Sequence, residues 1–175
     1  MRNNEIIVGN WSRLYSRPRE KKTTRTTREP RERYIKPAPL VEFENEYNEA
    51  QALKYPNIPP ECRARTKFSD KDANSLTRAI IAHLSFHGYF AARVNSTGVY
   101  DQRRGLWRVS NARRGLADIS AVINGKAVQL EIKAGNDRPR TEQMRVQREV
   151  QAAGGVYEFV HNFTEYIEIY KRLTF

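Results

Sequence analysis

The chain has 175 residues and a net charge of +11, and 39% of its residues are hydrophobic. This length accommodates one ordinary domain with an extension and excludes two large cores. The single cysteine, Cys62, excludes an internal disulfide, and no apolar run approaches the roughly 20 residues that span a bilayer. The positive charge indicates a polyanionic partner, with nucleic acid as the leading candidate, although a solvated basic surface without a specific partner explains the charge equally well.

The amino-terminal 40 residues are strongly basic. They hold 11 Lys and Arg residues against 4 Asp and Glu residues, and they contain little apolar surface to offset the entropy cost of ordering. We therefore expect residues 1–40 to form a flexible, disordered basic arm. The first ten residues have only the apolar triplet 6–8, which is too short for a signal-peptide core. We accordingly expect a cytoplasmic protein, or a virion-associated one if it serves a phage.

Residues 41–66 differ from the arm in charge and composition. Residues 41–61 hold 5 acidic residues against one lysine and end in the proline-bearing stretch Tyr55–Pro60. Because proline cannot continue a helix, this segment predicts a short helix followed by a linker. We expect the compact domain to occupy residues 67–175.

Hydrophobic periodicity and turn residues predict an α/β domain with a mixed central sheet and flanking helices. Apolar residues at helical spacing follow the capping sequence Ser69–Asp72, and Gly88 stands where that first helix would end. Two strand-like runs flank Asn124-Gly125, the dipeptide most typical of a two-residue hairpin turn. Residues 96–114 are basic and aromatic without a clear period, so we expect a loop there. The expected elements are a helix at 70–86, strands at 89–94, 116–123 and 126–133, a helix at 141–153, a strand at 156–160 and a helix at 163–172.

The histidines and the cysteine show no zinc-ligand spacing. His83 and His87 stand four residues apart on the first expected helix, but the sequence offers no third ligand near them. We interpret both as ordinary packed or surface side chains.

The hairpin turn determines which residues oppose one another across the two strands. If Asn124-Gly125 is the turn, the register places Asp118 directly opposite Glu131. Because strand side chains alternate between faces, the same register separates an apolar face from a polar one. The polar face would carry Asp118, Ser120, Gln129, Glu131 and Lys133.

Two directly opposed carboxylates repel each other, since their Cβ atoms would lie roughly 4.5–5.5 Å apart. A positive group is therefore expected between them. A divalent cation such as Mg²⁺, which takes oxygen ligands, is one interpretation. Lys133, on the same face, is the other, and it would make an ion cluster without a function. The geometry alone leaves both open.

Asp118, followed thirteen residues later by Glu131-Ile132-Lys133, resembles the signature of the PD-(D/E)XK nuclease superfamily. Four blocks in the same order resemble its VRR-NUC branch more closely. They are residues 93–98 (RVNSTG), residues 115–119 (GLADI), residues 131–133 (EIK), and Gln143 with Gly154-Gly155. The resemblance covers roughly residues 70–170 and implies a restriction-endonuclease-like core that hydrolyses phosphodiester bonds.

The resemblance also implies roles for individual side chains. Asp118 and Glu131 would bind Mg²⁺ or Mn²⁺, with the backbone carbonyl of Ile132 as a further ligand. Lys133 would orient the attacking water or stabilise charge on the phosphorus. Gln143 would support the site from the following helix.

The residues expected to contact nucleic acid fall into two groups. The resemblance implies Arg93 and Asn95. The arginines ahead of the Asp118 strand are expected to hold phosphates, namely Arg103, Arg104, Arg113 and Arg114. Tyr100 and Trp107 lie among them and would be available to stack on unpaired bases, with a solvated loop as the alternative.

Two positions depart from the family pattern. Superfamily members commonly carry a further acid on the first helix, whereas Ser75 stands near that place here. Asp72 or Asn74 is left to substitute, or the site works with two acids. Ala117 replaces a proline that shapes the backbone and does no chemistry.

The resemblance thus implies a metal-dependent endonuclease, with DNA favoured over RNA as its substrate, although the sequence leaves that choice open. Analogy suggests structure-selective cleavage of junctions or flaps. Two rival interpretations remain. One is a nuclease fold that binds nucleic acid with weak or no catalysis, and the other is a structural or packaged nucleic-acid-associated protein of a phage or mobile element. The oligomeric state stays open, a homodimer included.

Overall fold

The computed structural model describes residues 34–94, 99–108, 113–135 and 137–175. Most of the expected basic arm, up to residue 33, lies outside these residues, and so does Asn95. Tyr34–Phe175 form one compact unit. No helix in the described part of the chain is long and apolar enough to cross a membrane.

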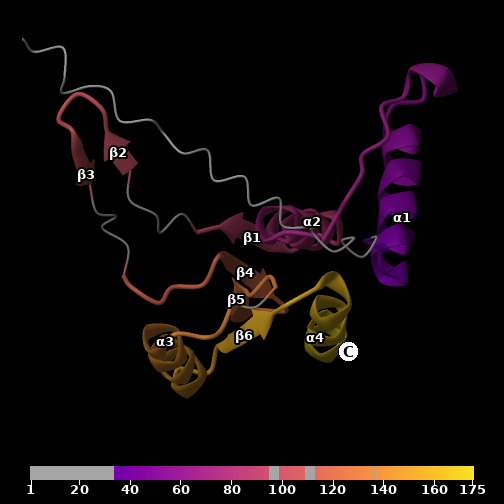
Figure 1. The fold of residues 1–175 in the computed structure, drawn as a ribbon. Helices are drawn as coiled ribbons and strands as arrows, with labels where there is room; N and C mark the ends of the chain where they lie inside the picture. The colour runs from indigo at the N-terminus through magenta and orange to yellow at the C-terminus, as the bar shows by residue number, and fades with distance from the viewer. Residues whose placement is uncertain (1–33, 95–98, 109–112, 136) are drawn as a thin grey trace, which may run out of the picture. The chain divides into compact units, whose positions relative to one another are not determined.

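A mixed sheet is built from the strands β1 (Phe90–Arg93), β4 (Ile119–Ile123), β5 (Lys126–Ile132) and β6 (Val156–Val160). The strand order is β1-β4-β5-β6 (Figure 1). β1 pairs with β4, and β4 with β5, in antiparallel orientation, whereas β5 and β6 are parallel. The α/β class and the mixed central sheet predicted from the sequence are confirmed.

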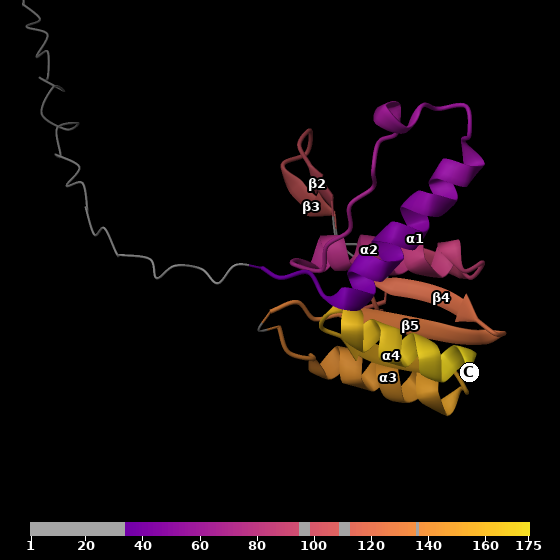
Figure 2. The ribbon, with the colours of Figure 1, turned by 90° about the vertical axis from the view of Figure 1, so that its right-hand side faces the viewer.

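The described residues also form α1 (Ala38–Lys54), a 3-10 helix (Pro60–Cys62), α2 (Ala73–Phe86), α3 (Thr141–Ala152) and α4 (Phe163–Thr174). Figure 2 shows α2 and α3 on opposite sides of the sheet. The larger core lies on the α2 side, where α1, α2 and α4 pack against apolar residues of β4 and β5. A smaller cluster on the other side joins Val146 of α3 to Ala117 and Tyr157.

Side-chain caps explain where two of these helices begin. The Asp72 carboxylate accepts a hydrogen bond of 3.0 Å from the amide of Ser75 at the start of α2. The Asn162 side chain accepts one of 2.9 Å from the amide of Glu165 at the start of α4. Such caps satisfy amides that have no partner within the helix.

The β4–β5 hairpin has the predicted register. Ile123 pairs with Lys126 and Ile119 with Leu130, with Asn124-Gly125 as the turn. Both turn residues have a positive φ, 48° and 76°, as a type I′ turn requires. The inward residues of both strands belong to the larger core, so the predicted apolar face is confirmed.

The expectation of a loop at residues 96–114 is wrong for residues 99–108, whereas the described residues 113 and 114 belong to no helix or strand. Residues 99–108 form a second, two-stranded antiparallel sheet, β2 (Val99–Asp101) and β3 (Leu106–Arg108). Strands of three residues are too short to show a period. The turn between them is held by the Asp101 side chain, which accepts hydrogen bonds of 3.1 and 3.3 Å from the amides of Arg103 and Arg104.

The compact unit begins earlier than the expected start at residue 67. A helix forms in the acidic segment as predicted, but Leu40 and Phe43 of α1 are buried in the main core. The expected linker is also held onto α1, since the Asn48 amide bonds both the N–H and the C=O of Thr66, at 2.8 and 2.9 Å. Side-chain contacts of this kind produce no hydrophobic periodicity, so the sequence did not predict them.

Candidate metal and catalytic site

Strand β5 positions two charged residues on the face opposite the main core. Val128, Leu130 and Ile132 point into that core, so the intervening positions face α3. Gln129 and Ser120 meet on this second face, with a hydrogen bond of 3.0 Å between their side chains. Glu131 and Lys133 follow Gln129 at the same two-residue spacing, and their exposed fractions are only 5% and 1%.

Asp118 stands just before β4, at the edge of the hairpin. The ladder ends with Ile119 and Leu130, one pair short of the expected Asp118–Glu131 pair. The backbone carbonyl of Asp118 accepts a hydrogen bond of 2.8 Å from Val94. Its carboxylate accepts one of 3.0 Å from the amide of Ile132, which follows Glu131. The structure therefore brings Asp118 beside the Glu131–Ile132 peptide.

The two acids influence each other electrostatically. Burial raises the pKa of Glu131, and the negative charge of Asp118 raises it further, while Lys133 acts in the opposite direction. A positive charge beside Glu131 would therefore stabilise the ionised form of its carboxylate.

Lys133 supplies part of that charge. Its Nζ lies 3.3 Å from Oε1 of Glu131 and 3.0 Å from Oδ2 of Asp137. The backbone amide of Lys133 donates to the carbonyl of Val160 at 2.9 Å, which extends the parallel pairing with β6 and fixes the start of the side chain. The hydrogen bond from Lys133 lowers the pKa of Asp137. Asp137 was not expected at the site from the sequence, because a four-residue spacing brings side chains together on a helix and Lys133 and Asp137 do not lie on one.

Gln143 reaches the same carboxylate from α3. Its Oε1 accepts a hydrogen bond of 2.9 Å from the amide of Arg140, and its Nε2 donates to Oε1 of Glu131. The first of these bonds fixes the orientation of the side-chain amide, so its donor end faces Glu131. The sequence expectation that Gln143 lies at the site agrees with this placement.

The second oxygen of Glu131 has a different environment. Oε2 is buried and has no hydrogen-bond partner among the described residues. Leaving a buried polar atom unsatisfied costs about 1–3 kcal/mol, and more when the group is charged. No group of three or more His, Cys, Asp or Glu residues that could hold a metal occurs in the described ranges. A cation here would therefore have Asp118 and Glu131 as its carboxylate ligands, completed by backbone carbonyl and water oxygens.

Gly115 and Tyr157 hold the loop before Asp118 against α3. Gly115 has a φ of +87°, and a Cβ added there would lie 2.5 Å from the carbonyl oxygen of Glu142. The Tyr157 hydroxyl donates to the Gly115 carbonyl at 3.2 Å. Burial raises the pKa of Tyr157, and the charges of Glu131 and Asp118 raise it further, so the phenol stays protonated. Sequence analysis did not select Tyr157, because a tyrosine in a strand gives no sign of what it will face.

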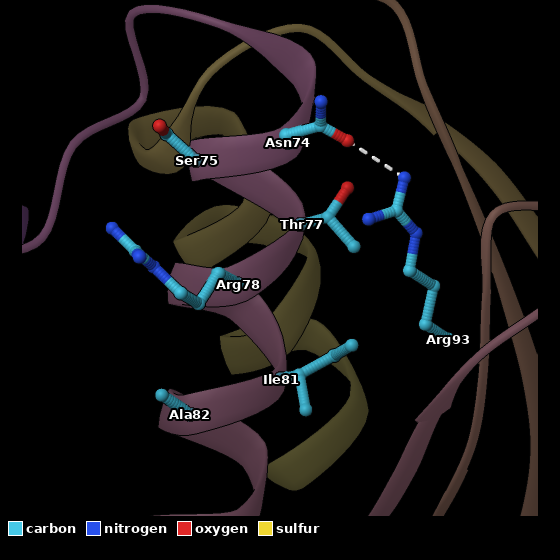
Figure 3. Close-up of a pocket in the computed structure, with 7 residues that line it drawn as sticks. All are labelled: Asn74, Ser75, Thr77, Arg78, Ile81, Ala82 and Arg93. Atoms are coloured by element: carbon cyan, nitrogen blue, oxygen red, sulfur yellow. Dashed lines mark hydrogen bonds between the residues drawn. The ribbon is translucent and has the colours of Figure 1, made fainter.

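The first turn of α2 holds the residues considered as substitutes for the missing helix acid. Both Asp72 carboxylate oxygens bond Ser75, one to its amide and one to its hydroxyl at 2.7 Å. Asn74 accepts a hydrogen bond of 2.7 Å from Arg93 of β1. Asn74 and Arg93 line a pocket of about 520 Å³. Figure 3 shows their hydrogen bond, with Thr77 and Ile81 on the same side of α2 as Asn74.

The loop arginines are dispersed over different elements. Arg103 and Arg104 are exposed in the β2–β3 turn. Arg113 forms an ion pair with Glu149 of α3, which occupies its guanidinium, whereas Arg114 is exposed. The four arginines therefore do not form one cluster within the described part of the chain.

A scan against protein-family models found no matching family, and a search among curated proteins found no match. The fold defines an α/β protein with a mixed four-stranded sheet.

Proposed function

We propose that this chain is a metal-dependent nuclease that hydrolyses phosphodiester bonds in DNA. The observation that carries the proposal is Glu131, a buried carboxylate with one oxygen that has no partner among the described residues, next to a second carboxylate, Asp118. Lys133 and Gln143 meet its other oxygen. The order α2, β1, β4, β5, α3, β6 supports a restriction-endonuclease-like core around these residues.

The residues present fit a hard divalent cation. Asp118, Glu131 and the backbone carbonyl of Ile132 would hold Mg²⁺ or Mn²⁺, since such ions take oxygen ligands and usually use one or two carboxylates. When bound, the cation would polarise a phosphoryl oxygen and lower the pKa of a bound water. It would also satisfy the buried oxygen of Glu131 and offset the repulsion from Asp118.

Lys133 and Gln143 would prepare the site before substrate arrives. Lys133 is held between two acids, at 3.3 Å from Glu131 and 3.0 Å from Asp137, so its ammonium is positioned in advance. A positioned positive charge can orient the attacking water or stabilise negative charge that develops on the phosphoryl group. Gln143 would keep Glu131 in one orientation, as groups behind metal ligands commonly do.

The proposed substrate is DNA, with structure-selective cleavage as the finer proposal. The net charge of +11 supports a polyanionic substrate, and the exposed Arg104 and Arg114 are available for phosphate contacts. Junctions, flaps and single strands are the substrates to compare with plain duplex.

The test is cleavage of labelled single-stranded, duplex, flap and four-way-junction DNA by the full chain with Mg²⁺ or Mn²⁺. We expect cleavage to be lost in EDTA and in Asp118→Asn, while DNA binding persists. Gln143→Leu should reduce the rate about 10- to 100-fold, the usual effect of removing a group behind a metal ligand. Glu168→Gln is the matched control, because it removes an exposed acid of α4 and leaves the Arg113–Glu149 ion pair in place. Equal cleavage by wild type and Asp118→Asn would refute the proposal.

A nucleic-acid-binding protein without catalysis is the second candidate, and the first turn of α2 favours it. Ser75 stands where the superfamily commonly has an acid, Asp72 is engaged as the cap of α2, and Asn74 is bonded to Arg93. Tight DNA binding by wild type, without cleavage in either metal, would select this candidate.

A further inference from the structure

The β2–β3 hairpin presents two large aromatic rings to solvent on one face. Tyr100 and Trp107 are directly opposed in its register, and their ring centroids lie 5.6 Å apart. The exposed fractions of the two residues are 48% and 70%. Because the strands alternate, Leu106 points to the opposite face, where it is 62% exposed.

The turn of the same hairpin carries positive charge. Arg103 and Arg104 are exposed, and the Asp101 side chain accepts hydrogen bonds from both of their amides. The backbone of the turn is therefore fixed while both guanidinium groups extend from it. Exposed aromatic rings beside fixed arginines provide stacking surfaces for bases and contacts for phosphates on one small element.

We infer that the β2–β3 hairpin binds unpaired nucleotides, with bases stacking on Trp107 and Tyr100 and the backbone phosphates on Arg103 and Arg104. Charge complementarity favours a polyanion at this tip, because it carries two exposed arginines, and it disfavours a second copy of the chain, whose net charge is +11. The inference rests on the proposed function for the class of ligand, but it concerns binding alone. It makes single-stranded regions the part of the substrate that this hairpin recognises.

A purely structural use of the aromatic pair makes a different prediction. Two-stranded hairpins are marginally stable, and cross-strand aromatic pairs stabilise them. If the rings only stabilise the hairpin, they should not increase the affinity of the chain for an oligonucleotide with bases over one without bases. The discriminating measurement is therefore the response of Trp107 itself to oligonucleotides with and without bases.

The chain has two tryptophans, so Trp11→Phe leaves Trp107 as the single reporter. We would titrate this variant, in EDTA to prevent cleavage, with an oligothymidylate of about 12 nucleotides, an oligouridylate of equal length and an abasic oligonucleotide of equal length. We expect Trp107 fluorescence to be quenched by the first two and unchanged by the abasic chain. Unchanged fluorescence at saturating oligothymidylate would overturn the inference.

Affinity measurements on variants provide the second readout. Trp107→Ala should weaken oligothymidylate binding about 5- to 150-fold, and Trp107→Phe should retain most of the affinity. Leu106→Ala is the matched control, because it removes an equally exposed apolar side chain from the other face of the same hairpin. Equal weakening by Leu106→Ala and Trp107→Ala would overturn the inference, since it would indicate hairpin unfolding.

Salt dependence tests the arginines separately. For single strands the slope of log K against log salt is about −0.7 for each phosphate neutralised, so replacing Arg103 and Arg104 by glutamine should reduce its magnitude by about 1.4. An unchanged slope would contradict the phosphate contacts. Concentration-dependent self-association that Trp107→Ala abolishes, with no quenching by nucleic acid, would instead assign the surface to a second copy of the chain.

These outcomes are independent of catalysis. Metal-dependent cleavage without Trp107 quenching would leave the proposed function intact and refute the hairpin inference. Quenching of Trp107 in a chain that never cleaves DNA would support the hairpin inference and refute the proposed function.

Discussion

Lys133 is the most constrained side chain of the candidate site. A buried ammonium is tolerated only when it is paired, and Glu131 and Asp137 both lie within 3.3 Å of it. Among the described residues, Glu131 in turn has one oxygen with partners and one without. A bound cation, as proposed above, would satisfy the second oxygen.

Gly115 is important for stability, because the loop that contains it lies close against α3. Gly115→Ala places a Cβ 2.5 Å from the Glu142 carbonyl in a backbone with a positive φ, so we expect a loss of about 2–4 kcal/mol in the free energy of unfolding. Urea denaturation measures it. Gly154→Ala is the control, because Gly154 also has a positive φ but has open space around it, and it should cost only about 1 kcal/mol. Equal losses would contradict the close approach.

His83 gives the stability a defined pH dependence. Burial, and secondarily the nearby His87, lowers its pKa to about 3, and its Nδ1 lies 2.8 Å from the Tyr166 hydroxyl. The rings of Tyr166 and Tyr170 also pack against it. Below a pH of about 6.5, His83 binds a proton in the unfolded chain but not in the folded one. The free energy of unfolding is therefore unaffected by His83 above that pH and decreases as the pH falls toward 3.

The expected contribution of His83 is close to 1.4 kcal/mol per pH unit within this window. Urea unfolding of wild type and His83→Phe at pH 6 and pH 5 should therefore show a shallower loss in the variant, by about 1 kcal/mol. Identical slopes in wild type and His83→Phe would show that His83 titrates normally. His83 lies buried in the core, whereas His87 is exposed.

At the scale of elements, local sequence predicted best where neighbours in the chain decide the structure. The Asn124-Gly125 turn determined the β4–β5 register, and the register determined which face received Glu131 and Lys133. Strands β2 and β3 were not predicted, because they have three residues each. The helix α1 was predicted, but its place in the core was not, because it buries only Leu40 and Phe43.

The contribution of α1 to the core is directly testable. The Phe43 ring contacts Phe68, His83 and Phe163, with centroid distances of 4.9, 4.9 and 6.0 Å. Phe43→Ala should therefore cost about 3–5 kcal/mol in the free energy of unfolding. Val41→Ala on the same helix, at a partly exposed position, should change it by no more than about 0.5 kcal/mol. A small effect of Phe43→Ala would contradict the contribution of α1 to the core.

At the scale of the whole molecule, a cation bound at Asp118 and Glu131 would stabilise the fold, because the unfolded chain lacks the site. At a concentration of 100 times Kd the expected gain is about 2.7 kcal/mol, which corresponds to a rise in Tm of about 5–10 °C. Thermal unfolding with Mg²⁺ or Mn²⁺ and without nucleic acid measures it. Asp118→Asn should abolish the shift and Glu168→Gln should keep it. A shift that survives in Asp118→Asn would locate the cation elsewhere.

The sequence by itself determined the α/β class, the hairpin register and the face that carries the acids, because each depends on residues close together in the chain. Only the tertiary structure brought Gln143 to Glu131, Gly115 against Glu142 and α1 into the core. These contacts join segments that are separated in the chain, and the sequence of one segment does not indicate which other segment it will contact. The unpartnered oxygen of Glu131 belongs with them, since satisfaction of a buried atom depends on everything packed around it.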